Sequence, residues 1–210
     1  MFADRNDAAK RLADALAKYK GRHPLVLAIP RGAVPMAEII ADALDGELDV
    51  VLVRKLRSPY SPEFAVGSVD ESGWCYIADY AQSAGADPEY LEREKQRQLE
   101  ILAQRRAQYA PPVDPEGRIA IVVDDGLATG STMISALHAL RSKNPAFLVC
   151  AVPVAPPETM VKVEKLADDA VCLEMPENFQ AVGQFYGSFP QVEDEEVITI
   201  LKRFHEKQLR

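Results

Sequence analysis

Residues 119–132 read Ile-Ala-Ile-Val-Val-Asp-Asp-Gly-Leu-Ala-Thr-Gly-Ser-Thr, and this stretch decides the expected fold. Its first five residues form a continuous apolar run, which predicts a strand buried on both faces. Small and polar residues then lead into a helix expected over 130–142. A buried strand that passes directly into a helix is the repeating unit of a parallel sheet covered on both sides.

The same alternation of strand and helix extends in both directions from this stretch. Further apolar runs predict strands at 25–29, 49–53, 147–154 and 170–173. Helical spacing of apolar residues predicts helices at 4–20, 34–44, 157–167 and 194–208. We therefore expect an α/β fold: a Rossmann-like, mainly parallel five-stranded sheet with helices on both faces.

Residues 58–117 interrupt this rhythm. The runs 65–69 and 74–78 flank Asp-Glu-Ser-Gly, which predicts a hairpin. Pro88 then opens a long charged helix to about Tyr109, with Asp87 as its N-cap. We expect one domain over 1–210, with an insertion at about 58–117 and a C-terminal hood and helix at about 176–210.

Composition narrows the class of protein. The chain has 210 residues, 48% of them hydrophobic, and a net charge of -8, which suits one packed domain and is a poor electrostatic match for nucleic acid. The three cysteines form no Cys-x-x-Cys pair, so neither a zinc ribbon nor a disulfide framework is expected. Because no apolar run has the length of a signal peptide or a membrane span, we expect a cytoplasmic protein without a membrane partner.

The loop after the strand at 119–123 carries the clearest chemistry. Its small residues and the following helix N-terminus leave backbone N–H groups free to bind an anion, and the hydroxyls of Thr129, Ser131 and Thr132 add donors. Asp124 and Asp125 suit a ligand that bears hydroxyls or a metal ion close to its phosphate. The alternative is structural: a capping acid pair followed by an ordinary helix entry.

This aliphatic–acid–acid–Thr-Gly-small-Thr pattern resembles the 5-phosphoribosyl-1-diphosphate (PRPP) motif of type I phosphoribosyltransferases. The resemblance covers nearly the whole chain and implies the fold predicted above. It implies that Asp124 and Asp125 hold the ribose hydroxyls and approach a Mg²⁺ cofactor through the ribose or water. The implied cradle for the 5-phosphate and its flanks comprises Gly126, Leu127, Ala128, Thr129, Gly130, Ser131 and Thr132.

Two further segments acquire roles through the same resemblance. The turn Pro30-Arg31-Gly32-Ala33, which alone reads as a tight strand-to-helix turn, would hold pyrophosphate through Arg31 and Gly32. Lys55, with Arg54 as second choice, would add a basic group at the end of the strand at 49–53; a solvated basic edge is the alternative. The residues expected to act in catalysis are Asp124, Asp125, Arg31 and Lys55.

The acceptor side of the site is less defined. The insertion carries Arg93, Arg97, Arg105 and Arg106, some of which could reach the phosphates, although exposed Glu–Arg pairing explains each one more simply. Phe185 or Tyr186 could stack on a flat ring, and ordinary packing explains them equally well. None of the three histidines shows ligand spacing.

The resemblance implies transfer of the phosphoribosyl group of PRPP to a nucleobase-like acceptor. Ala128 occupies the position at which the hypoxanthine–guanine enzymes carry a proton-accepting aspartate, so the acceptor stays open. Dimers are common in the family, which makes a homodimer an expectation by analogy. The alternatives are a PRPP-sensing regulator, and an enzyme that hydrolyses PRPP or binds ribose 5-phosphate without a base.

Overall fold

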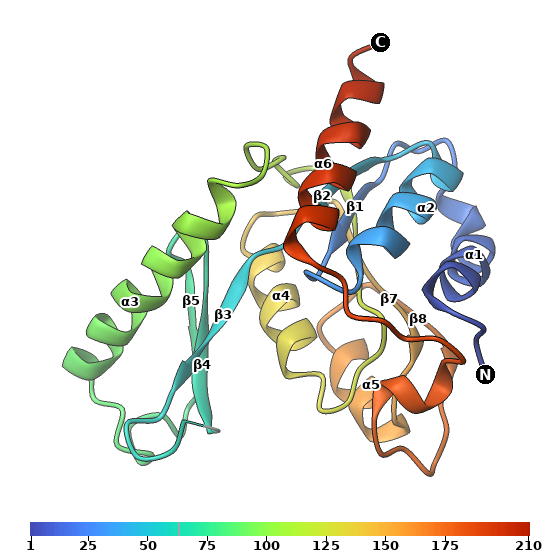
Figure 1. Cartoon of the computed structure of the whole chain (residues 1–210). Coiled ribbons are helices and arrows are strands. Elements are labelled where there is room, and N and C mark those ends of the chain that lie inside the picture. Colours follow the sequence, from blue (N-terminus) through green and yellow to red (C-terminus); the bar gives the residue numbers. More distant parts are fainter. Residues whose placement is uncertain (63) are drawn as a thin grey trace.

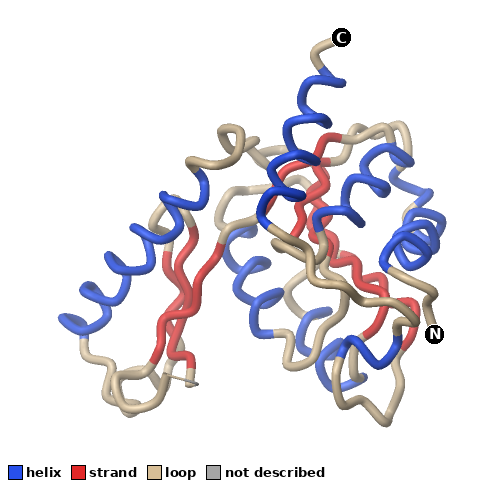
Figure 2. Tube along the Cα trace, in the orientation of Figure 1, coloured by secondary structure: helices blue, strands red, loops and turns tan. Residues whose placement is uncertain are grey.

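The central sheet has five parallel strands in the order β2-β1-β6-β7-β8, seen in a computed structural model that describes residues 1–62 and 64–210 (Figures 1 and 2). All four neighbouring pairs run parallel. The strands are β1 (Leu25–Ala28), β2 (Glu47–Val50), β6 (Ile119–Val123), β7 (Phe147–Val154) and β8 (Asp169–Glu174). The predicted fold class is confirmed.

Alternate residues of β1 and β6 enter two separate cores, as the pleat of a sheet requires. One core lies under α1 (Arg5–Ala15), α2 (Val34–Leu44) and α6 (Asp194–Gln208). The other lies under α4 (Ser131–Arg141) and α5 (Pro157–Glu164). In β6, Ile121 and Val123 face the first core while Ala120 and Val122 face the second. This burial on both faces explains why the strands are continuous apolar runs.

A second sheet stands beside the first and is antiparallel, in the order β3-β4-β5 (Figure 1). Its strands are β3 (Val53–Arg57), β4 (Ala65–Asp70) and β5 (Cys75–Ile77), and α3 (Pro88–Arg106) runs along it. The predicted hairpin and long helix are confirmed, and the side chain of Asp87 accepts the N-cap hydrogen bond from Tyr90 N. We call β3, β4, β5 and α3 the antiparallel lobe.

The expectation of one strand over 49–53 is wrong. The central strand β2 already ends at Val50, and Val53 begins β3 of the other sheet. The apolar run Val50–Val53 thus passes from one sheet to the next. The basic residues 54–57 consequently lie within β3 and not after a strand of the central sheet.

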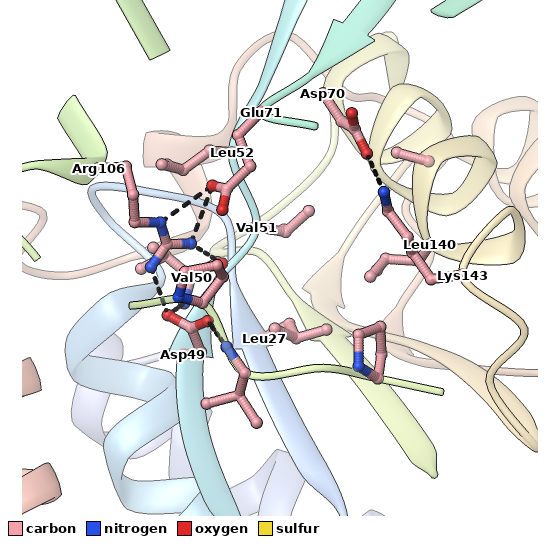
Figure 3. Close-up of a pocket in the computed structure, with 14 residues that line it drawn as sticks. Leu27, Asp49, Val50, Val51, Leu52, Asp70, Glu71, Arg106, Leu140 and Lys143 are labelled. Carbon is pink, nitrogen blue, oxygen red and sulfur yellow. Dashed lines mark hydrogen bonds and ion pairs between the residues drawn. The ribbon is translucent and has the colours of Figure 1, made fainter. Parts of the chain in front are cut away.

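The lobe is joined to the central sheet by an ionic cluster around Arg106 (Figure 3). The guanidinium donates to Asp49 Oδ1 at 3.0 Å, to Glu71 Oε2 at 2.9 Å and to two backbone carbonyls. Asp49 also accepts from Val113 N at 2.9 Å. Arg106 ends α3, Asp49 lies in β2 and Glu71 follows β4, so three elements meet at this cluster.

The remaining helices differ little from expectation. The helix expected at 4–20 ends at Ala15, and a short 3-10 turn follows at Ala17–Tyr19. A second 3-10 turn occupies Val182–Phe185 in the irregular segment before α6. Among residues 1–62 and 64–210, no helix has both the length and the apolar character needed to cross a bilayer.

Candidate functional site

The loop 124–130 leaves β6 and turns directly into α4. Gly130 adopts a left-handed φ of 75°, which favours glycine, and a Cβ there would lie 2.6 Å from the Thr159 side chain. The hydroxyl of Thr159, from α5, donates to the carbonyl oxygen of Ala128 at 2.7 Å. The loop is therefore held against α5 while its opposite side stays open.

That open side presents hydrogen-bond donors. Ser131, Thr132 and Met133 form the first turn of α4, where backbone N–H groups have no partner within the helix. The hydroxyls of Thr129 and Ser131 lie 3.2 Å apart. Converging N–H and hydroxyl groups at the positive end of a helix dipole form an anion site.

The two acids at the end of β6 have different surroundings. Asp124 Oδ1 accepts from the backbone N–H of Asp125 at 2.8 Å. Burial and the adjacent charge of Asp125 raise the pKa of Asp124 well above its ordinary 3.8. Asp125 instead forms an ion pair with Arg5, whose Nη2 and Nε lie 2.9 and 3.1 Å from Oδ2. The charge of Asp125 is thus compensated by Arg5, whereas the surroundings of Asp124 favour its protonated form.

The turn after β1 lies next to this acid pair. Strands β1 and β6 are neighbours in register, with Ala28 opposite Val123, so the segments that follow them emerge at the same sheet edge. The contact is close: a Cβ on Gly32 would overlap Oδ2 of Asp125. Only glycine fits at position 32 while Asp125 keeps this conformation.

Two cavities adjoin the acid pair. One, of about 240 Å³, is lined by Lys55, Asp124, Gly126–Met133 and Val182. The other, of about 360 Å³, is lined by Asp125, Arg5, Arg31, Gly32 and residues 189–192. The acids therefore separate a hydroxyl- and N–H-rich cavity from one that contains two arginines.

All the residues expected to act together are near one of these two cavities. Lys55, carried by β3 of the antiparallel lobe, faces the loop cavity, whereas Arg54 turns away and donates to Gln98 Oε1 at 2.9 Å. Arg31 lies loosely beside two acids, 3.7 Å from Asp194 and 3.9 Å from Glu193. Its guanidinium thus retains donors for a ligand.

The expectations for the acceptor side fare differently. Tyr186 is buried and donates its hydroxyl to the carbonyl oxygen of Asp125 at 2.6 Å, so its ring supports the loop and cannot stack on a ligand. Phe185 stacks on Phe179, with ring centroids 5.2 Å apart. The packing interpretation therefore applies to Tyr186, while Phe185 is half-buried and packs one ring face on Phe179.

The arginines of α3 also serve structure. Arg93 pairs with Glu89 and Arg97 with Glu94 along the helix, and Arg106 belongs to the junction cluster. The exposed Glu–Arg pairing expected from the sequence therefore applies to Arg93 and Arg97, whereas Arg106 pairs with acids outside its own helix.

Arg5 is the residue that sequence analysis missed. It lies 120 positions from Asp125, at the start of α1, in a segment that carries only an amphipathic helical signal. Its guanidinium also lies over the Phe189 ring, 3.9 Å from the centroid, and donates to the carbonyl oxygen of Pro190. No local pattern could have revealed a contact that depends on both ends of the chain.

Comparison with known proteins identifies the family of the chain. The model of the phosphoribosyl transferase domain matches residues 3–187. Proteins from two strains of Mycobacterium tuberculosis, one named "Putative phosphoribosyl transferase Rv0571c", are 38% identical over 211 aligned residues, covering 98% of this chain and 47% of theirs. The chain thus spans about half the length of these curated relatives.

Two solved structures resemble the chain over most of its length. The crystal structure of TT1426 from Thermus thermophilus is 43% identical, with a TM-score of 0.87, and the match covers 97% of this chain and 98% of that one. A purine phosphoribosyltransferase from Pyrococcus horikoshii shares the fold at 16% identity, with a TM-score of 0.50 and coverage of 90% and 93%. By its match to the domain model over residues 3–187, the chain belongs to the phosphoribosyl transferase domain family.

Proposed function

We propose that this protein transfers the 5-phosphoribosyl group of PRPP to a nitrogenous base and releases pyrophosphate. The observation that carries the proposal is the position of the acid pair between two anion-suited cavities. PRPP has a matching order of groups: a phosphate at one end, a diol in the middle and a pyrophosphate at the other end. Family membership makes this ligand the natural choice.

Each part of the ligand has a proposed set of partners. The 5-phosphate would accept hydrogen bonds from the loop, Ala128 to Thr132, and face Lys55. The ribose hydroxyls would donate to Asp124 and Asp125. The pyrophosphate would lie against Arg31 and Gly32, where the guanidinium can bind two oxygens at once.

The chemistry is a displacement at C1 of the ribose. A ring nitrogen of the base contributes the electron pair of the new C–N bond, the C1–O bond breaks, and pyrophosphate leaves with its electron pair. The nitrogen then loses a proton to restore a neutral base. The protein would contribute by holding the reactants in line and by stabilising charge on the leaving group through Arg31.

Mg²⁺ is compatible with these residues as a companion of the ligand. Within the part of the chain that the structure describes, no three His, Cys, Asp or Glu side chains cluster to hold a metal ion by themselves. Mg²⁺ commonly uses one or two carboxylates, several waters and substrate phosphates. Asp124 and Asp125 supply such oxygens, and when bound the ion would neutralise charge on the pyrophosphate.

The direct test is to mix the protein with PRPP, Mg²⁺ and single nucleobases, and to follow release of pyrophosphate and formation of nucleotide. We expect release with at least one base and none for Asp124→Asn/Asp125→Asn. PRPP binding without turnover on any base would favour the sensor alternative. Release of pyrophosphate without a base would favour hydrolysis. Equal PRPP binding by the double variant and the parent would contradict the proposed site.

A further inference from the structure

Arg5 is built into the acid pair more firmly than a surface ion pair would be. Its side chain is 11% exposed and that of Asp125 is 17% exposed. The ring of Phe189 covers one face of the guanidinium, and the carbonyl oxygen of Pro190 accepts from Nη1. These contacts fix the guanidinium before any ligand arrives, because cation–π stacking and hydrogen bonds restrict its orientation.

The ion pair uses Asp125 asymmetrically. Both Nε and Nη2 of Arg5 donate to the same oxygen, Oδ2, so Oδ1 is not occupied by this contact. The usual fork-to-fork pairing of arginine with a carboxylate engages both oxygens. Gly32 contributes to the same arrangement, since any side chain there would overlap Oδ2. The result is a carboxylate whose rotation is fixed through one oxygen.

The location of the pair indicates a role in ligand binding as well as in packing. Arg5 and Asp125 both line the cavity that also contains Arg31 and Gly32. Asp124, next to it in the chain, lines the loop cavity on the other side. The contact with Arg5 therefore sets the orientation of Asp125 at the boundary between the two cavities.

We infer that Arg5 is a positioning residue: it holds Asp125 through Oδ2 so that the free oxygen of this carboxylate accepts from the ribose hydroxyls of the ligand. This inference rests on the proposed PRPP site. It assigns a function to a residue outside the motif loop and outside the turn after β1. It also gives the contact between the N-terminal helix and the segment 189–190 a role in ligand recognition.

The test distinguishes recognition of the sugar from recognition of the phosphate. Binding of ribose 5-phosphate and of inorganic phosphate is measured by calorimetry for the parent and for Arg5→Gln. We expect Arg5→Gln to weaken ribose 5-phosphate binding by about tenfold, as expected for loss of one charge-assisted contact. Phosphate binding should change by less than about twofold, because Arg5 does not line the loop cavity and independent sites affect each other by no more than about this factor. A defect of folding or of the loop would weaken both ligands alike.

Arg11→Gln provides a matched control. Arg11 lies on the same helix, pairs with Asp7 at 2.7 Å and lies over the Phe2 ring, 5.1 Å from its centroid, but it does not line either cavity. We expect this variant to bind both ligands like the parent. If Arg5→Gln does not fold, Arg5→Lys keeps the charge with fewer fixed donors, and we expect a smaller loss confined to ribose 5-phosphate.

Three results would overturn either the inference or the function beneath it, and they can be told apart. Equal weakening of both ligands in the Arg5 variants would mean that Arg5 acts only in folding. Unchanged binding of both would mean that Asp125 needs no positioning. Failure of the parent protein itself to bind ribose 5-phosphate would contradict the proposed function and not the role of Arg5 alone.

Discussion

Arg5 and Arg106 are both largely buried arginines paired with acids, yet their hydrogen bonding differs, and the difference separates a ligand-binding role from a structural one. Arg106 uses Nε, Nη1 and Nη2 for five hydrogen bonds to Asp49, Glu71 and two carbonyls. Arg5 makes three, and two of them share one oxygen. All five N–H groups of Arg106 are used, which suits a structural junction. Among the described residues, Arg5 keeps unused N–H groups and leaves Oδ1 of Asp125 available to a ligand, which suits a binding site.

The two regions also differ in their position on the fold. Arg106 joins the antiparallel lobe to β2 and lies against a cavity with a largely apolar wall (Figure 3). Arg5 lies where the segments after β1 and β6 emerge side by side. In open α/β sheets, ligands bind outside the carboxyl ends of the strands. An arginine at that edge, such as Arg5, can therefore serve ligand binding, whereas Arg106 at the junction serves the structure.

The largest effect should follow from breaking the Arg106 cluster. Arg106→Ala leaves Asp49 and Glu71 buried without a counterion, and removing one partner of a buried ion pair costs about 3–5 kcal/mol. Urea unfolding measures this loss. The control Arg93→Ala removes an exposed helical pair, expected to contribute about 0.3–0.5 kcal/mol. A similar small loss in both variants would contradict a structural role for Arg106.

Gly32→Ala should disrupt the contact between Arg5 and Asp125. The added Cβ would displace Oδ2 of Asp125, and misplacing a binding group by about 1 Å can reduce function by about 100-fold. We expect a loss of this size in ribose 5-phosphate affinity, measured by calorimetry. Gly21→Ala is the control: its left-handed φ of 75° makes alanine strained, but nothing surrounds the position. It should therefore affect stability and leave binding unchanged.

Lys55→Met tests whether a cation of the lobe serves the ligand. Lys55 faces the loop cavity, so its loss should weaken phosphate binding by about tenfold, with a smaller difference at high salt. Its neighbour Arg54 points to Gln98, and Arg54→Met should leave phosphate affinity near that of the parent. Titrations with phosphate at two ionic strengths decide this, and a larger effect from Arg54 would reverse the assignment.

The smallest effect concerns the ligand-free protein and Asp124. Its pKa is raised by burial, so the folded state holds this proton more tightly than the unfolded state does. The contribution of Asp124 to stability is therefore greatest at acid pH and is lost as pH rises through the raised pKa. Asp124→Asn should be more stable than the parent at pH 8, with the gap closing toward pH 4. Urea unfolding across this pH range measures the difference in unfolding free energy between the variant and the parent. A difference that grows on acidification would contradict a raised pKa of Asp124.

Much of the fold could be predicted because it depends on local patterns. Runs such as Ile119–Val123 are apolar throughout since both faces of the sheet are covered, and the loop that follows carries its motif in consecutive residues. The change of sheet between Val50 and Val53 could not be predicted, because an apolar run looks the same whether it stays in one sheet or crosses to another.

The contacts of the site were predictable only where they are local. Ala128, Gly130 and their neighbours form one segment, but Arg5 reaches Asp125 across 120 positions, and Arg106 reaches Asp49 across 57. For Tyr186 the sequence leaves two interpretations, a ring that stacks on a ligand and ordinary packing. The structure decides for packing, because the buried hydroxyl donates to the carbonyl oxygen of Asp125.

A crystal structure of the protein with PRPP and Mg²⁺ tests the central claim most directly. We expect the 5-phosphate against the loop residues Ala128 to Thr132 and the pyrophosphate beside Arg31 and Gly32. The ribose hydroxyls should lie on the acid pair, one of them on Oδ1 of Asp125, the oxygen that Arg5 does not contact. A ligand bound with its phosphate away from that loop, or in the cavity beside Arg106, would contradict it.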